Sequence, residues 1–168
     1  MTFEAETLHL AASALAECRA RRLTLGTVES CTGGLIAGAL TAIGGSSDVV
    51  MAGLVTYSNA AKTALAGVPH ELIKAHGAVS EPVVRAMAEG GRKRLGVDLC
   101  IAVTGIAGPG GGSPLKPVGL VWFAIASAGG TTAWAERFGD IGRENVRARS
   151  VNAALSRVNP VLTSPSCG

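Results

Sequence analysis

The segment LTLGTVESCTGGLIAGALTAI, from Leu23 to Ile43, predicts a strand, a sharp turn and a helix in immediate succession. Residues 23–28 are rich in residues that favour β-structure, and the helix that follows the paired glycines contains small residues that permit close packing. In an open α/β sheet, the turns that follow strands are where ligands gather. The segment therefore indicates an α/β fold and directs attention to the turn between strand and helix.

The rest of the chain continues this alternation. A helix with Ser80 as N-cap and Pro82 in its first turn is predicted to run to Leu95, and residues 59–65 begin a helix or form a loop. The other predicted helices cover residues 4–22, 70–76 and 143–158, the last ending at Pro160, and the other predicted strands cover 48–57, 97–103, 118–126 and 131–138. We expect one three-layer α/β/α domain with a mixed sheet over residues 1–159, followed by a flexible tail over 160–168.

The composition indicates a folded domain with a large interior. Of the 168 residues, 48% are hydrophobic and 16% are charged, which excludes a disordered chain. Part of the apolar surplus is expected in a subunit interface, so we predict a homodimer or a larger homo-oligomer. The longest apolar run, residues 118–128, is far shorter than the roughly 20 residues of a membrane span. The N-terminus carries Glu4 and Glu6 where a secretory signal is positively charged. We expect a cytoplasmic protein without a membrane partner.

Two further classes are disfavoured by composition. The net charge is only +3 and aromatic residues make up 4%, so the stacking platforms of a nucleic-acid-binding protein are missing and no nucleic-acid partner is expected. The four cysteines form no CxxC pair and have no histidine at ligand spacing, which argues for reduced thiols and against a zinc site. We predict no metal and no cofactor.

Three reactive side chains, Glu29, Ser30 and Cys31, are adjacent in the turn. Ser30 is either a nucleophile placed as in a nucleophile elbow or the N-cap of the following helix. A serine nucleophile needs a base, and the three histidines lie in unpromising positions. The segment VTYSNAAK offers Tyr57, the one tyrosine of the chain, and Lys62, one of four lysines against eleven arginines. Burial lowers the pKa of lysine until the amine accepts a proton, so the two form a proton-handling pair or are a core tyrosine and a surface lysine.

A glycine-rich loop, TGIAGPGGG, follows the strand predicted at 97–103. Its N–H groups either cradle a phosphate or carboxylate, with Lys116 as a point charge, or the loop is merely flexible. It lacks the Walker pattern and the Rossmann pattern in proper context, which argues against ATP or NAD binding by those routes. Arg143 and Arg147 lie one turn apart and either reach an anion or face water.

Five runs spread in order along the chain carry a family resemblance: VESCTGG at 28–34, VTYSN at 55–59 with Lys62, HGAVS at 76–80, VTGIAGPGG at 103–111 and KPVGLV at 116–121. Together they resemble the CinA C-terminal domain family over residues 7–158. That family includes bacterial nicotinamide-nucleotide amidohydrolases. The resemblance implies an α/β/α domain that converts nicotinamide mononucleotide (NMN) to nicotinic acid mononucleotide and ammonia, in pyridine nucleotide recycling. Larger members carry an additional N-terminal pyrophosphatase domain, which we do not expect in this chain.

The resemblance also implies site residues. Ser30 matches the family nucleophile, and Tyr57 and Lys62 match its proton-handling partners. We expect the oxyanion to be held by N–H groups near residues 31–34 or 104–105, and the ribose phosphate to be held by the glycine loop and Lys116. The expected substrate-binding positions are Glu29, Cys31, Thr32, Gly33, Gly34, Thr104, Gly105, Gly108, Gly110, Gly111 and Lys116. Two alternatives remain: a Glu29–Lys62–Cys31 amidase with a thiol nucleophile, and a catalytically silent nucleotide-binding module.

Overall fold

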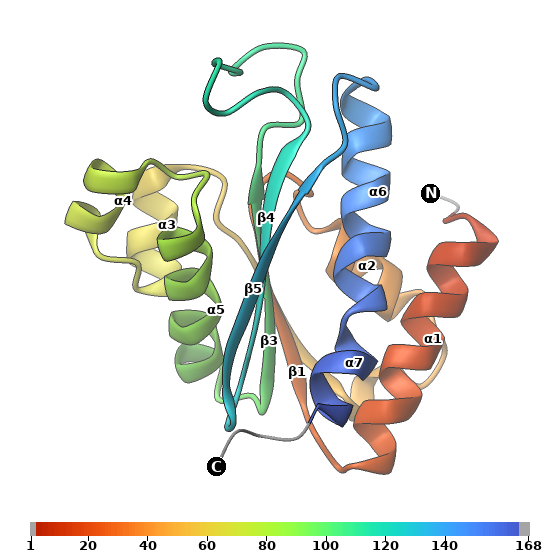
Figure 1. The fold of residues 1–168 in the computed structure, drawn as a ribbon. Helices are drawn as coiled ribbons and strands as arrows, with labels where there is room; N and C mark the ends of the chain where they lie inside the picture. The colour runs from red at the N-terminus through yellow and green to blue at the C-terminus, as the bar shows by residue number, and fades with distance from the viewer. Residues whose placement is uncertain (1–2, 165–168) are drawn as a thin grey trace.

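The computed structural model describes residues 3–164 and contains a five-stranded mixed sheet between two layers of helices (Figure 1). The strand order is β2-β1-β3-β4-β5; β1 pairs in parallel with β2 and β3, whereas β3, β4 and β5 are antiparallel. The strands are β1 (Leu25–Glu29), β2 (Val50–Val55), β3 (Leu99–Gly105), β4 (Leu120–Ser127) and β5 (Gly130–Arg137). The predicted α/β class, the mixed sheet and the final hairpin are confirmed.

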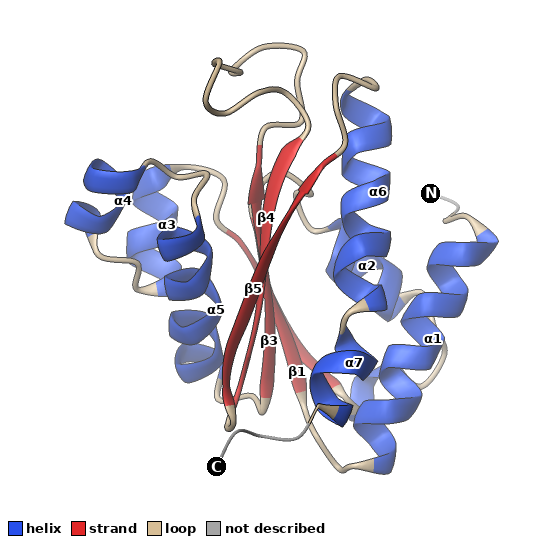
Figure 2. Ribbon diagram, viewed as in Figure 1, coloured by secondary structure: helices blue, strands red, loops and turns tan. Residues whose placement is uncertain are grey.

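Seven α-helices cover the two faces of the sheet within residues 3–164 (Figure 2). One layer contains α1 (Ala5–Ala20), α2 (Leu35–Thr41), α6 (Arg143–Ser156) and α7 (Val158–Thr163). The other contains α3 (Asn59–Ala66), α4 (His70–His76) and α5 (Glu81–Leu95). A short 3₁₀ helix, Ser46–Asp48, precedes β2. The described residues contain no helix that is long and apolar enough to cross a membrane.

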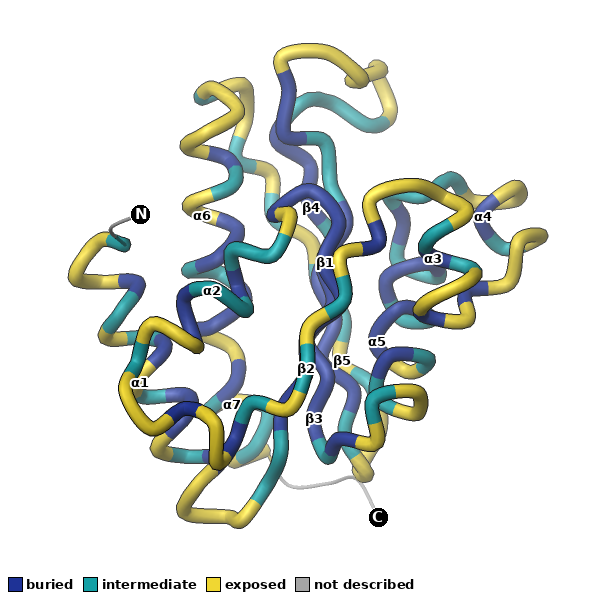
Figure 3. The backbone as a smooth tube through the Cα atoms, turned by 180° about the vertical axis from the view of Figure 1, so that it is seen from behind, coloured by how far each residue is buried: buried dark blue, intermediate teal, exposed yellow. Residues whose placement is uncertain are grey.

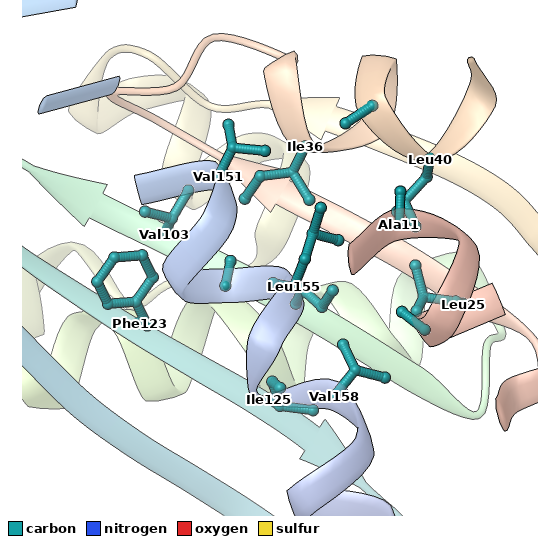
Figure 4. Packing of buried hydrophobic residues seen from close by; sticks show 14 of the residues in the cluster. Ala11, Leu25, Ile36, Leu40, Val103, Phe123, Ile125, Val151, Leu155 and Val158 are labelled. Carbon is teal, nitrogen blue, oxygen red and sulfur yellow. The ribbon is translucent and has the colours of Figure 1, made fainter. Parts of the chain in front are cut away.

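The buried residues of β3 and β4 are mostly large on one face of the sheet and small on the other. Because successive side chains of a strand point to opposite faces, Phe123 packs against Ile36 of α2 and Val151 of α6 (Figure 4), together with Ile101. Cys100 and Ala124 face α5 on the other side of the sheet. The small residues let α5 approach the sheet closely.

Two adjacent glycines of α5 form its tightest contacts. A Cβ atom at Gly91 would overlap Val28 on β1, and one at Gly90 would overlap the carbonyl oxygen of Ala66, at the end of α3. The pair Gly90–Gly91 therefore touches both a central strand and the neighbouring helix.

The last helical segment differs from the prediction. The helix α6 ends at Ser156, and Pro160 does not terminate a helix but lies in the first turn of α7. Proline is tolerated there because the first N–H groups of a helix have no intrahelical acceptor. Residues 160–163 of the predicted tail are thus helical and Ser164 is the C-cap of this helix, whereas residues 165–168 lie outside the described residues.

The strand order creates the site. The chain passes from β1 to β2 on one side and then returns to β3 on the other side, so the carboxyl ends of β1 and β3 form a topological switch point. Both strands are buried, whereas β2 at the sheet edge alternates between intermediate and exposed residues (Figure 3). Ser30 follows β1 and Thr104 lies near the end of β3, so the two predicted loops meet at this edge.

Candidate active site

Ser30 is held at the carboxyl end of β1. Its backbone N–H donates to the carbonyl of Val103 on β3 at 3.0 Å, so the backbone is fixed at this position. Only 8% of the residue is exposed. The hydroxyl group does not cap α2, because Gly34 is the N-cap residue and makes no side-chain capping bond. The N-cap alternative for Ser30 is therefore wrong.

Glu29 supplies the cap instead, from inside the protein. The residue is fully buried, and its carboxylate accepts five hydrogen bonds of 2.6–3.2 Å. The donors are the hydroxyls of Thr27 and Thr32 and the backbone N–H groups of Gly34, Ile36 and Ala37. An acid at a helix N-terminus satisfies donors that the helix leaves free. Because Glu29 occupies them, these N–H groups of α2 are not available to an anion, and the buried Glu29 carboxylate has a structural role.

Replacing Glu29 by glutamine is expected to lower the free energy of unfolding by about 3 kcal/mol or more, because a buried donor without an acceptor is costly. The Oε1 atom accepts from Ala37 N and the Oε2 atom from Gly34 N and Ile36 N, so the new amide would face at least one fixed N–H in either orientation. Urea denaturation measures the loss. Thr27→Val, which removes a single donor to the same carboxylate, is the control and should lose about 1 kcal/mol. Equal stability of the two variants would contradict the role of Glu29.

Lys62 comes from α3 and reaches Ser30 across the switch point. Its Nζ atom lies 3.0 Å from Oγ of Ser30 and donates to the carbonyl of Thr56 at 2.8 Å. The residue is 1% exposed, and no carboxylate of the described residues forms a salt bridge with it. Burial lowers the pKa of Lys62 from its ordinary value of 10.5. A buried amine without an acidic partner favours its neutral form, which is the form that accepts a proton from a serine hydroxyl.

Tyr57 lies at the opening of the site rather than beside the nucleophile. Tyr57 is 61% exposed, and its hydroxyl accepts a hydrogen bond of 2.9 Å from Nη2 of Arg143. It forms no hydrogen bond with Ser30 or Lys62 within the part of the chain that the structure describes. The alternative of a core tyrosine and a surface lysine is therefore wrong for both residues, because Tyr57 is exposed and Lys62 is buried.

A pocket of about 200 Å³ joins these residues. Of the residues predicted for the site, it contains Ser30, Cys31, Tyr57, Lys62, Thr104 and Gly105. It also contains Arg143 and four residues that were not predicted, Asn59, Ala78, Val79 and Ala107. Ala78 and Val79 belong to the HGAVS run, and Thr104 holds this run in place by donating from Oγ1 to the carbonyl of Ala78 at 3.0 Å. The run was a signal for the site, but the two of its residues that line the pocket, Ala78 and Val79, carry no reactive group.

The other predicted substrate ligands do not line this pocket. Thr32, Gly33 and Gly34 form the turn behind Ser30, and Gly108, Gly110 and Gly111 lie farther along the glycine loop. Lys116 donates from Nζ to the carbonyl of His76 at 2.6 Å and lines a neighbouring hollow, which shares Val79 with the pocket. The predicted phosphate site at Lys116 is therefore not part of the pocket that contains Ser30.

Cys31 lines the pocket but is poorly suited to nucleophilic attack. Burial raises the pKa of its thiol to about 12, so the reactive thiolate is disfavoured. Glu29 bonds to α2 and the two threonines rather than to Lys62. The arrangement needed by the Glu29–Lys62–Cys31 alternative is absent from the described residues. They also contain no group of three or more histidine, cysteine or acidic residues that could hold a metal ion.

Arg147 fastens α6 to the turn. Its Nε atom donates to the carbonyl of Cys31 at 3.2 Å and its Nη2 atom to the carbonyl of Thr32 at 3.1 Å. The sequence left two alternatives for Arg147, that it reaches an anion or that it faces water. The observed contact with the backbone is neither of these. Arg147 stabilises the backbone next to Ser30.

The fold and the paired Ser30 and Lys62 define a three-layer α/β domain with a serine–lysine site at its topological switch point. A family profile described as the CinA C-terminal domain matches residues 7–162. The chain belongs to this family, and the resemblance stated from the sequence is confirmed.

Curated relatives share the domain and extend beyond it. A CinA-like protein of Parasynechococcus marenigrum (strain WH8102) is 53% identical over 158 residues, which are 94% of this chain and 38% of that protein. A protein of Symbiobacterium thermophilum named putative competence-damage inducible protein is 53% identical over 154 residues, 84% of this chain and 35% of that protein. The chain thus spans less than two-fifths of the length of these relatives.

Solved structures match the whole fold. The competence/damage inducible protein CihA from Agrobacterium tumefaciens superposes with a TM-score of 0.94 at 44% identity, covering 97% of this chain and 99% of that one. A CinA superfamily protein from Klebsiella pneumoniae 700603 gives 0.89 at 36% identity, covering 93% and 97%. These similarities confirm the predicted α/β/α architecture, and the names of these proteins state no reaction.

Proposed function

We propose that this chain is a nicotinamide-nucleotide amidohydrolase that converts NMN to nicotinic acid mononucleotide and ammonia. The observation that carries the proposal is the 3.0 Å contact between Nζ of Lys62 and Oγ of Ser30, with no acidic partner for Lys62 among the described residues. A serine beside a neutral amine is an activated nucleophile, and such pairs act on amide carbonyls. The family resemblance supplies the substrate.

The first half of the reaction forms an ester on Ser30. Lys62 accepts the hydroxyl proton while Oγ of Ser30 attacks the carboxamide carbon. The backbone N–H of Cys31, which donates to no oxygen acceptor among the described residues, supports the developing oxyanion from the position next to the nucleophile. The C–N bond then breaks, and the proton held by Lys62 leaves with ammonia.

The second half releases the acid. Lys62 accepts a proton from a water molecule that attacks the ester carbon, and this proton returns to Oγ of Ser30 as the ester bond breaks. The carbonyl of Thr56, which accepts a hydrogen bond from Nζ, keeps the amine aimed at Ser30 through both halves. The sum is hydrolysis of one carboxamide without a metal or cofactor.

The size of the pocket agrees with a nucleotide amide. At about 200 Å³ it is smaller than the roughly 300–1,000 Å³ typical of ligand pockets, so it suits the pyridine ring and its carboxamide rather than the whole nucleotide. The ribose phosphate then extends through the opening. Binding energy from this remote part of the substrate can raise the rate at the amide.

An ammonia-release assay on the purified chain tests the proposal, with NMN and free nicotinamide as substrates. We expect one ammonia and one nicotinic acid mononucleotide for each NMN consumed, and a rate with nicotinamide at least about 100-fold lower because the ribose phosphate is missing. Heat-denatured protein is the control. NMN that binds for hours without ammonia release would contradict the proposal and support the silent binding module.

A further inference from the structure

We propose that Arg143 binds the phosphate group of the substrate at the opening of the pocket, and that Tyr57 positions its guanidinium group. This inference rests on the proposed function, which identifies the substrate as an amide with a phosphate at its far end. It assigns the phosphate to a residue that lies 27 positions beyond Lys116, the cation expected from the sequence.

The depth of the pocket orients the substrate. The reacting pair is at the buried end, where Ser30 is 8% and Lys62 is 1% exposed. The other end is formed by Tyr57, which is 61% exposed, and by Arg143, which is also exposed. An amide that reaches Ser30 therefore directs the rest of its molecule toward Tyr57 and Arg143.

The guanidinium group of Arg143 is held in place by two hydrogen bonds and keeps further N–H donors free. Its Nη1 atom donates to the carbonyl of Gly108 and its Nη2 atom donates to the hydroxyl of Tyr57, both at 2.9 Å. A guanidinium group has five N–H donors, so these two bonds leave three for a ligand. No carboxylate of the described residues lies within salt-bridge distance of Arg143. An oriented guanidinium group with free donors and no counter-ion is suited to bidentate binding of a phosphate.

The other cations near the site either do not line this pocket or lie at its buried end. Lys62 is bound to Thr56 and Ser30, Lys116 donates to the carbonyl of His76 and lines a neighbouring hollow instead of this pocket, and Arg147 donates to Cys31 and Thr32. The first turn of α2 offers no alternative anion site because Glu29 occupies its N–H groups. Within the described residues, Arg143 is the cation that the pocket leaves for the phosphate.

The contact with Arg143 also gives Tyr57 a different role from the proton handling that the resemblance implies. Its hydroxyl accepts from the guanidinium group and is not hydrogen-bonded to Ser30 or Lys62 among the described residues. A hydroxyl in this position fixes the direction of the remaining N–H donors. Tyr57 is thus a positioning residue for substrate binding.

Calorimetric binding to Ser30→Ala protein tests Arg143 without turnover. With Arg143→Met added, the dissociation constant of NMN should rise about 10- to 100-fold, whereas that of nicotinamide riboside, which has no phosphate, should stay within about twofold. Arg149→Met removes an exposed charge from the same helix outside the pocket and is the matched control. Unchanged NMN binding by Arg143→Met, or an equal loss in Lys116→Met, would overturn the inference.

Tyr57→Phe separates positioning from proton handling. As a positioning residue, its replacement should raise KM for NMN about three- to tenfold, leaving kcat and its pH profile unchanged and turnover of nicotinamide riboside unaffected. A fall in kcat with both substrates would instead assign Tyr57 to proton transfer and overturn its role here. Complete absence of ammonia release would refute the proposed function alone, because weaker binding of NMN by Arg143→Met would still establish the phosphate site.

Discussion

Replacing Ser30 by alanine is expected to lower the rate of NMN deamidation by about 10⁴-fold or more, because the reaction loses the atom that attacks the carboxamide. The hydroxyl group bonds to Lys62 and does not cap α2, so its removal leaves the fold intact. The measurement is kcat/KM from ammonia release. NMN binding and the thermal unfolding midpoint should both remain near the wild-type values.

Cys31→Ala provides the comparison for this variant. It removes the neighbouring reactive side chain but retains the backbone N–H next to Ser30. Because burial raises the pKa of the thiol to about 12, we expect the activity of Cys31→Ala to stay within about tenfold of wild type. For the same reason, the wild-type protein should remain active after treatment with a thiol-alkylating reagent. A large loss in Cys31→Ala with little loss in Ser30→Ala would show that the thiol is the nucleophile.

Lys62→Met is expected to lower kcat by about 10²- to 10⁴-fold, the usual contribution of a general base. Methionine is similar in length but cannot accept a proton. The variant should be close to wild type in stability, because removal of a buried amine that has no acidic partner in the described residues offsets the loss of its hydrogen bond to the carbonyl of Thr56. A variant that unfolds readily, or that keeps its activity, would contradict this role for Lys62.

The pH dependence of the deamidation rate and of stability also tests the role of Lys62. The wild-type rate should rise with pH as Lys62 loses its proton, and this rise should begin below the ordinary lysine pKa of 10.5 because burial lowers the pKa. In the same range the unfolded chain binds more protons than the folded one, so stability rises as the pH increases toward 10.5. Lys62→Met should abolish this contribution, which urea denaturation at several pH values would detect.

The sequence predicted those parts of the fold and the site that depend on neighbouring residues. The strand, turn and helix around Ser30 follow from β-propensity, paired glycines and small helical residues, and the observed α2 begins one residue after Gly34. The scarcity of lysine singled out Lys62, although its partner lies 32 residues away. The prediction that Pro160 ends the last helix was wrong, because a proline is compatible with the first turn of a helix as well as with the position after a helix end.

The long-range contacts of the site could not be predicted in this way. Tyr57 and Arg143 are 86 residues apart, and their contact depends on how α6 lies against the carboxyl end of the sheet. A flexible lysine after a glycine loop suggested a phosphate ligand, but the carbonyl of His76 binds Lys116 instead. Glu29 looked reactive because it adjoins Ser30, yet alternation along β1 directs its side chain into the interior under α2.

The two adjacent glycines of α5 have a consequence for the reaction. Gly91 packs on Val28, two residues before Ser30, and Gly90 packs on Ala66, one turn after Lys62. The backbone of α5 thus packs against both the strand that leads to Ser30 and the helix that contains Lys62. Because neither glycine has a side chain, α5 lies close to both elements, and this packing helps to fix the distance over which the proposed proton transfer between Ser30 and Lys62 occurs, although neither glycine lines the pocket.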